Sequence, residues 1–186
     1  MMQIRLAVPG DESGIATVHV DAWRTTYKGM VSDEFLAALS YERRKELWER
    51  NLAQEDNLVF VAVNSDERIV GFASGSSSPK GGSGKYNAEL TAIYLLEEIQ
   101  GTGVGKRLVT ELFKAFAGQG HGSVFVWVLE DNKSKHFYEH LGAQKVETAV
   151  VRIGDRDLNE LGLGWDPEAF HRIAGPVAGS EGFNHA

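Results

Sequence analysis

The chain has 186 residues, of which 42% are hydrophobic and 24% are charged, and its formal net charge is −7. This length suits one well-buried domain, and an acidic balance without a basic run argues against a nucleic-acid partner. The absence of cysteine excludes disulfides, thiolate metal sites and a cysteine nucleophile. No apolar run approaches the roughly 18 residues of a membrane span, and no signal or lipid-attachment motif is present. We therefore expect a soluble cytoplasmic protein without a membrane partner.

Hydrophobic periodicity predicts strands and helices along the chain, with no internal repeat and no linker between domains. Short alternating or continuously apolar runs predict strands at 3–8, 57–63, 68–74, 89–95, 124–129, 145–153 and 157–163. Apolar residues at helical spacing predict helices from Asp11 to about Tyr27, one or two over 32–52, then 106–117 and 133–141. The Ser- and Gly-rich stretch 75–84 predicts a mobile loop. We expect one domain over 1–166 and a flexible C-terminal extension over 167–186.

A glycine-rich turn, Gln100-Gly101-Thr102-Gly103-Val104-Gly105, separates the predicted strand at 89–95 from the predicted helix at 106–117. A helix start exposes unpaired backbone N–H groups, and glycines let a phosphate approach them. A P-loop is excluded because Gln100 replaces its first glycine and Arg107 its Ser or Thr. The dinucleotide fingerprint also fails, because the glycines stand at 101, 103 and 105 with none at 106.

The remaining pattern is Q-x-x-G-x-G, formed by Gln100, Gly103 and Gly105. It resembles motif A of the GNAT acyl-CoA N-acyltransferases, which cradles the pyrophosphate of coenzyme A. A helix entry that needs only positive φ angles would carry similar glycines, so the loop alone leaves both interpretations open. The resemblance implies cofactor contacts from Gln100, Gly101, Thr102, Gly103, Val104, Gly105 and Lys106.

A second segment resembles motif B of the same family. Glu130-Asp131-Asn132 follows the apolar strand at 124–129, and Ser134 and Phe137-Tyr138 come next. Asn132 is expected to cap the following helix, and Gly142 is expected to end it in a left-handed turn. Ser134 and Tyr138 are four residues apart and therefore share a helix face. The resemblance implies that Asn132 and Ser134 contact the cofactor and that Tyr138 protonates the leaving thiolate.

The resemblance covers about residues 3–163 and implies an α/β (α+β) GNAT fold, a mixed sheet of about seven strands with about four helices. It also implies transfer of an acetyl group from acetyl-CoA, without a metal, to a primary amine of a small molecule or peptide by direct attack. A homodimer is compatible with it. Two alternatives stay open: a catalytically silent acyl-CoA-binding or sensor module on this fold, and a transferase of longer acyl groups. The sequence does not choose an acceptor.

Glu89 is the candidate general base, because it lies at the position where some members of the family place a glutamate on this strand. A period of two puts Glu89 on one face with Thr91, Ile93 and Leu95. A solvated strand-end carboxylate, with water as the base, is the competing interpretation. By resemblance, the backbone of Ile93, Tyr94 and Leu95 pairs with the pantetheine arm and polarises the thioester carbonyl.

Two aromatic residues at the end of the first predicted helix, Trp23 and Tyr27, are candidates for the acceptor wall. Members of the family shape their acceptor site with the helices between 11 and 52. The alternative for these aromatics is a helix-packing cluster with Trp48. Neither interpretation requires a metal, and the six histidines show no metal-ligand spacing.

Overall fold

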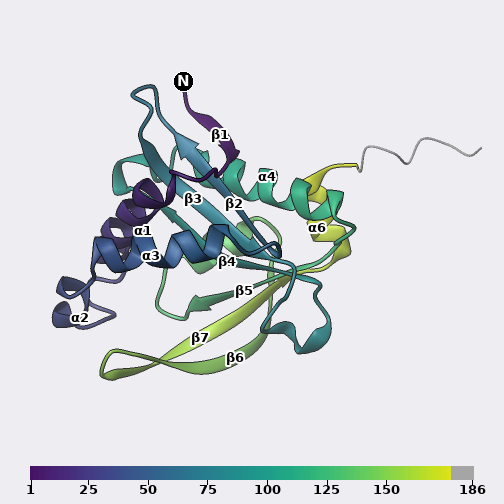
Figure 1. Ribbon diagram of the computed structural model, residues 1–186. Helices are drawn as coiled ribbons and strands as arrows, with labels where there is room; N and C mark the ends of the chain where they lie inside the picture. The colour runs from purple at the N-terminus through teal and green to yellow at the C-terminus, as the bar shows by residue number, and fades with distance from the viewer. Residues whose placement is uncertain (177–186) are drawn as a thin grey trace, which may run out of the picture.

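The computed structural model describes residues 1–176 of the chain. Its centre is a seven-stranded sheet with the order β1-β2-β3-β4-β5-β7-β6 (Figure 1). The pair β4–β5 is parallel and the other neighbouring pairs are antiparallel, which confirms the predicted mixed sheet. The strands are β1 Gln3–Leu6, β2 Asn57–Val63, β3 Ile69–Ser76, β4 Ala88–Leu95, β5 Val124–Leu129, β6 Gln144–Ile153 and β7 Arg156–Trp165.

Six α-helices flank this sheet, where the sequence predicted about four. They are α1 Glu12–Thr26, α2 Asp33–Ala37, α3 Tyr41–Leu52, α4 Val104–Gly118, α5 Ser134–His140 and α6 Pro167–Ala174. The region 32–52 holds two helices because Ser40 is extended and its side chain accepts the Arg43 N–H, which starts a new helix. Among the described residues, no helix is both long enough and apolar enough to cross a bilayer.

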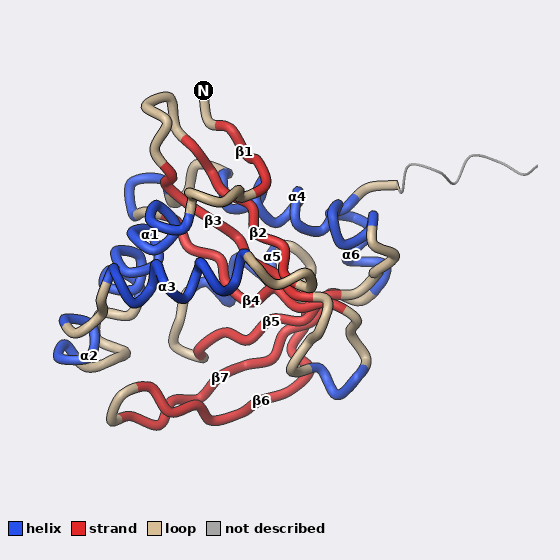
Figure 2. Tube along the Cα trace, in the orientation of Figure 1, coloured by secondary structure: helices blue, strands red, loops and turns tan. Residues whose placement is uncertain are grey.

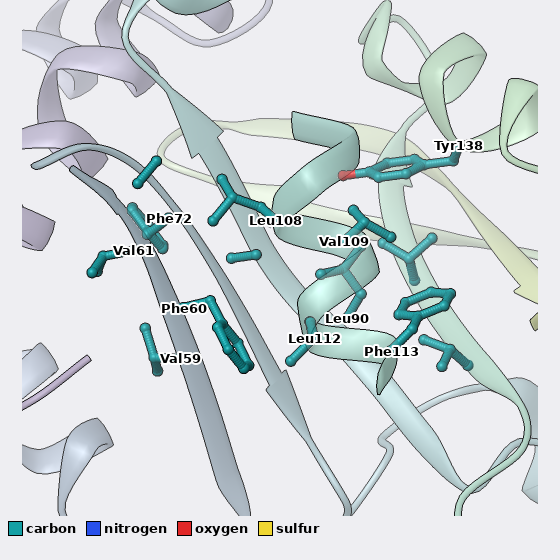
Figure 3. Close-up of a cluster of buried hydrophobic side chains, with 14 of the residues drawn as sticks. Val59, Phe60, Val61, Phe72, Leu90, Leu108, Val109, Leu112, Phe113 and Tyr138 are labelled. Atoms are coloured by element: carbon teal, nitrogen blue, oxygen red, sulfur yellow. The ribbon is translucent and has the colours of Figure 1, made fainter. Parts of the chain in front are cut away.

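The two faces of the sheet are covered by different helices. Helices α4 and α6 pack together on one face, whereas α1 and α3 pack on the other (Figure 1). Helix α4 turns Leu108, Leu112 and Phe113 into the core, where they meet the apolar side chains of the central strands (Figure 3). These three side chains are fully buried. The sheet and α4 therefore form the rigid base on which the site is built.

Strands β4 and β5 run side by side for a short distance only. Their pairing covers Ala88 to Leu90 on β4 and Val124 to Val126 on β5, after which the strands separate. Beyond this point no strand of residues 1–176 pairs with the β5-facing edge of β4, while its other edge stays paired with β3 through Leu95. An unpaired strand edge presents backbone N–H and C=O groups to whatever lies in the gap.

A β-bulge at Thr91 overturns the expected face of β4. Ser74 pairs with Ala92 and the next residue of β3, Gly75, pairs with Leu90, so Thr91 is the extra residue. The side-chain alternation shifts by one at the bulge. Glu89 therefore shares its face with Ala92 and Tyr94, on the α1 side, and Ile93 and Leu95 face α4. The prediction that Glu89 lies on one face with Ile93 and Leu95 was wrong, because a period of two holds only in an unbroken strand.

The C-terminal part differs from the expected flexible extension. Asp166 accepts the Ala169 N–H and begins α6, with Pro167 in its first turn. Phe170 is fully buried and stacks on Phe113 of α4 at 5.3 Å between ring centroids. The first part of the expected extension is thus a packed helix, which buries Ala169, Phe170 and Ala174. Residues 177–186 of that extension lie outside the described residues.

The loop between β3 and β4 contains the short 3₁₀ turn Gly82–Gly84 and lies beside one end of β7 (Figure 2). Two carboxylates hold it: Glu89 accepts the Lys80 N–H at 3.0 Å, and Glu147 accepts the Gly82 N–H. Its glycines lie close to Phe125, so a Cβ at Gly81 would stand 2.3 Å from that ring. Part of the stretch predicted as a mobile loop is therefore tethered to the sheet.

Candidate active site

A cavity of about 850 Å³ opens where β4 and β5 separate. Most residues that the sequence nominated line it: Trp23, Tyr27, Ile93, Tyr94, Leu95, Gln100, Gly101, Gly103, Gly105, Lys106, Asn132, Ser134 and Tyr138. Glu89, Thr102 and Val104 are the nominated residues that do not line it. The fold thus gathers segments from both halves of the chain around one opening.

The glycine turn forms the floor at the start of α4. Gly101 has φ 74° and Gly103 has φ 86°, the left-handed region, and a Cβ at either would point into open space. The first N–H groups of α4 have no acceptor within the helix, as in any helix. No side chain of the residue before α4, Gly103, caps them either. Those groups and the positive end of the helix dipole suit a phosphate or pyrophosphate.

Gly105 is needed for a different reason. It lies inside α4 and is buried, and a Cβ there would stand 3.3 Å from Leu95 Cδ1 and 3.4 Å from the Phe137 ring. The glycine therefore lets α4 approach the end of β4 and α5 closely. This contact fixes the distance between the turn and the gap beside β4.

The polar side chains of the turn support the turn itself. Gln100 Nε2 donates to the carbonyl of Leu95 at 3.3 Å, and Thr102 Oγ1 donates to the carbonyl of Ile99 at 2.6 Å. Val104 is buried in the core, so only its backbone is available to a ligand. Lys106 is exposed in the first turn of α4 and lines the cavity. A bound anion would accordingly meet backbone N–H groups and one lysine.

The segment after β5 provides the opposite wall. Asn132 is buried, and its Oδ1 accepts the Ser134 N–H at 2.9 Å. The helix starts one residue later than predicted, with Lys133 in the capping position and Asn132 acting from the residue before it. Gly142 follows the end of α5 with φ 98°, which confirms the predicted left-handed turn.

Tyr138 lies on α5 between the cavity and the core. Its side chain is 6% exposed, packs edge-on against Trp165, and points its hydroxyl toward the N-terminal end of α4 (Figure 3). Burial raises the pKa of Tyr138, and the proximity of Tyr27 adds to the shift. The hydroxyl therefore keeps its proton at neutral pH and is able to donate it.

An aromatic cluster forms the wall on the α1 side. The Tyr27 and Tyr94 hydroxyls are hydrogen-bonded at 3.0 Å, and the Trp23 ring lies 4.5 Å from that of Tyr27. Behind them, His19 stacks on Tyr94 and accepts the Trp48 indole N–H at 3.1 Å through Nδ1. Trp23 thus lines the cavity and also belongs to a helix-packing cluster. The two interpretations that the sequence left open for it are compatible.

Glu89 lies away from the cavity wall. It is 7% exposed, and its carboxylate is bonded to the Lys80 N–H in the tethered loop. Burial raises the pKa of Glu89, and this hydrogen bond opposes the rise. Glu89 is therefore buried, unlike the solvated strand-end carboxylate of the competing interpretation. Its hydrogen bond to the Lys80 N–H holds the loop between β3 and β4.

The match to known proteins is consistent over most of the chain. Residues 20–143 match the model of the acetyltransferase (GNAT) family. The chain is 37% identical over 165 residues to the uncharacterized N-acetyltransferase YuaI of Bacillus subtilis (strain 168), covering 89% of this chain and 93% of YuaI. The chain belongs to the GNAT acetyltransferase family. It is therefore an acyltransferase with an acyl-CoA cosubstrate.

Solved GNAT structures share its fold. The PaiA N-acetyltransferase of Thermoplasma acidophilum in complex with coenzyme A superposes with a TM-score of 0.67 at 22% identity, over 89% of this chain and 99% of that one. A mutant spermidine/spermine N-acetyltransferase SpeG of Vibrio cholerae gives 0.64 at 16% identity, over 92% and 98%. The free helix N-terminus, the open glycine turn and the unpaired edge of β4 fit an acyl-CoA.

The GNAT cavity also contains residues that the sequence did not nominate. They come from the bulge, the second half of β5 and the β6–β7 hairpin: Thr91, Trp127, Leu129, Val151, Ile153 and Glu160. Leu129 pairs with Glu160, and Glu160 pairs with Ala149 on β6, so these side chains share a face by register. The alternation of the last two strands was visible in the sequence, but their register against β5 was not.

Proposed function

We propose that the protein transfers the acetyl group of acetyl-CoA to a primary amine of a small molecule or peptide by direct attack. The observation that carries this proposal is the convergence of the uncapped start of α4, the unpaired edge of β4 and the buried Tyr138 hydroxyl on one cavity. The relatives named above are N-acetyltransferases, and SpeG acts on spermidine and spermine. One cavity lined both by the glycine turn and by Trp23 and Tyr27 suits attack without a covalent enzyme intermediate.

Each part of the reaction has a candidate group. The pyrophosphate would rest on the N–H groups of Gly103 to Lys106, and Asn132 and Ser134 would border the pantetheine arm. The free backbone of Ile93 to Leu95 would pair with that arm and polarise the thioester carbonyl. As the C–S bond breaks, Tyr138 would give its proton to the thiolate. Trp23 and Tyr27 would hold the acceptor.

A screen of primary amines with a free-thiol assay tests this proposal directly. Thiol release above the amine-free rate, with an acetylated product of the expected mass, is the expected result. Calorimetry with acetyl-CoA and a longer acyl-CoA measures acyl-chain preference, and tighter binding and faster turnover of acetyl-CoA are expected. Binding of acyl-CoA with no transfer to any amine would instead favour the sensor module.

Four predictions from the sequence accompany the proposal: a cytoplasmic location, a homodimer, metal-free catalysis and Glu89 as the general base. For the last role Glu160, which lines the cavity, is the rival carboxylate. Light scattering at several protein concentrations checks the oligomeric state, and fractionation of the source cells checks the location. Activity that survives exhaustive chelation would support the prediction of metal-free catalysis.

A further inference from the structure

The charged side chains of the cavity are unequally distributed between its two ends. Lys106 and Lys133 border the starts of α4 and α5, where an anionic cofactor would sit, and Asp131 is exposed beside them. Lys28 is exposed beyond the end of α1. Glu160, by contrast, lies near the middle of β7, next to the edge strand β6, and is partly buried. It is the carboxylate that the acceptor end of the described cavity offers.

Apolar groups surround this carboxylate on its own face of the sheet. Glu160 lies opposite Leu129 on β5 and Ala149 on β6, and the cavity wall continues along β6 with Val151 and Ile153. Trp23, Tyr27 and Met30, at and just after the end of α1, line the same cavity and pack with Leu129, and Trp127 lies two residues before Leu129 on β5. The acceptor end is therefore an apolar, partly aromatic chamber with one carboxylate in its wall.

No described residue forms an ion pair with Glu160. It takes part in none of the ion pairs or side-chain hydrogen bonds found among residues 1–176. Burial raises the pKa of Glu160, and the charge of Glu89 adds to the rise. A partly desolvated carboxylate without a partner gains stability when a cation or a proton joins it. Glu89 is the titratable group whose charge acts on Glu160, Glu147 shares its face by the register of β6, and Tyr27 and Lys28 line the same cavity.

We propose that Glu160 binds the ammonium group of the acceptor and accepts its proton, and that the acceptor is a primary monoamine on an apolar body. This inference rests on the proposed acetyl transfer and narrows its acceptor. One carboxylate neutralises one ammonium, and the aromatic rings nearby favour a cation attached to apolar carbon. The exposed Lys28 at the rim disfavours a second ammonium group, so a polyamine fits this chamber less well.

The proton transfer balances the reaction. An N–H bond of the ammonium breaks and its proton moves to a carboxylate oxygen of Glu160. The freed lone pair forms the C–N bond to the thioester carbonyl carbon, the C–S bond breaks, and Tyr138 donates a proton to the sulfur. The attacking nitrogen loses its second proton, which restores Tyr138 by way of solvent. Glu160 then releases the ammonium proton to solvent, so one proton leaves overall. A raised basicity of Glu160 favours the first of these steps.

Binding of a simple probe tests the role of Glu160 without a known acceptor. Protein saturated with CoA is titrated by calorimetry with 2-phenylethylamine and, separately, with the uncharged 2-phenylethanol. We expect the amine to bind the wild type at least about tenfold more tightly than the alcohol, and Glu160→Gln to remove that difference. The control is Glu130→Gln: Glu130 is exposed, lies outside the cavity lining and bonds Asn159, so the preference for the amine should survive.

Each result is decisive. If CoA binds the wild type but the amine does not, or binds Glu160→Gln equally well, the inference is overturned while the proposed function stands. If spermidine binds the CoA complex more tightly than 2-phenylethylamine, the monoamine class is wrong. If neither CoA nor acetyl-CoA binds the folded wild type, the proposed function fails and the inference falls with it. Circular dichroism and thermal melting confirm that both variants are folded.

Discussion

The two ends of the cavity are built in different ways. The cofactor end consists mainly of backbone from short contiguous segments, around 93–106 and 132–138. The acceptor end consists of side chains from the end of α1, from β5 and from the β6–β7 hairpin, which lie far apart in the chain. Backbone N–H groups serve any sequence that keeps the turn, whereas side chains change with each substitution. Such a division suits enzymes that share one acyl donor but differ in the acceptor molecule they use.

The largest effect is expected at the junction of the two ends, where Tyr138 faces the reacting sulfur in the proposed mechanism. Tyr138→Phe should lower kcat by about 10²–10⁴, the usual worth of general acid–base help. Acetyl-CoA binding should be unchanged, because the hydroxyl is needed only as negative charge develops on sulfur. Steady-state kinetics with an accepted amine and calorimetry with acetyl-CoA measure the two quantities.

Tyr41→Phe provides the control, since Tyr41 is exposed on α3 and its hydroxyl bonds Asp21. It should leave kcat unchanged. Because the pKa of Tyr138 is raised, its hydroxyl keeps its proton through the neutral range and should not produce a basic limb there. An unchanged kcat for Tyr138→Phe would assign the proton to another donor.

The next effect concerns the backbone-built end. Gly103→Val should weaken acetyl-CoA binding by more than about tenfold, or about 1.4 kcal/mol, because the new side chain enters open space at the start of α4. A β-branched residue at φ 86° also costs stability, roughly 1–2 kcal/mol. Calorimetry measures the affinity and thermal melting of the ligand-free protein measures the fold.

Gly118→Val is the matched control at the other end of the same helix. Gly118 has no positive φ, and its added Cβ would also meet open space. Acetyl-CoA should bind this variant as it binds the wild type. Full affinity in Gly103→Val would show that the glycine turn is only a helix entry, which is the alternative that the sequence left open.

The cofactor end could be predicted from the sequence far better than the acceptor end. Gln100 to Gly105 and Asn132 to Tyr138 are local patterns, and the structure brings both to the cavity. Glu160 was missed because its place depends on the register of β7 against β5, a pairing between segments distant in the chain. The bulge at Thr91 was missed because one unpaired residue leaves no mark on a short apolar strand. Local chemistry was predictable, and long-range register was not.

Acid should lower the stability of the fold through His19, which packs behind the aromatic wall of the acceptor end. Burial lowers the pKa of His19 to about 3 from 6.5, with the Arg44 charge as a second cause. A histidine that stays neutral when folded contributes full stability above pH 6.5, and that stability is lost as the pH falls from 6.5 toward 3. The loss is of the order of 1.4 kcal/mol per pH unit. Denaturant unfolding at several pH values measures it.

His19→Gln should flatten this pH dependence, although it lowers stability at neutral pH by removing an aromatic packing partner of Tyr94 and Trp48. His136→Gln changes an exposed histidine on α5 and should leave the slope as in the wild type. A wild-type slope in His19→Gln would mean that other groups cause the acid sensitivity. The slope, rather than the absolute stability, is the informative quantity.

The smallest effect, and the sharpest test of the acceptor end, concerns Glu89. Its folded pKa is raised above the ordinary 4.5, so its protonated form is favoured by folding. That contribution is present below pH 4.5 and is lost as the pH rises through the folded pKa. The wild type should therefore lose stability relative to Glu89→Gln over this rise. Denaturant titrations of both proteins across the acidic range measure the difference.

The kinetics of the same variant decide between two carboxylates. If Glu160 accepts the ammonium proton, the acidic limb of kcat/KM should persist in Glu89→Gln and disappear in Glu160→Gln. A modest displacement of the limb is expected in Glu89→Gln, because the charge of Glu89 raises the pKa of Glu160 and its removal moves the limb to lower pH. If the limb disappears only in Glu89→Gln, Glu89 is the general base, and Glu160 only contacts the acceptor amine. Because Gln at 89 keeps the size of the side chain and an oxygen for the Lys80 N–H, loss of the loop tether would not account for that result.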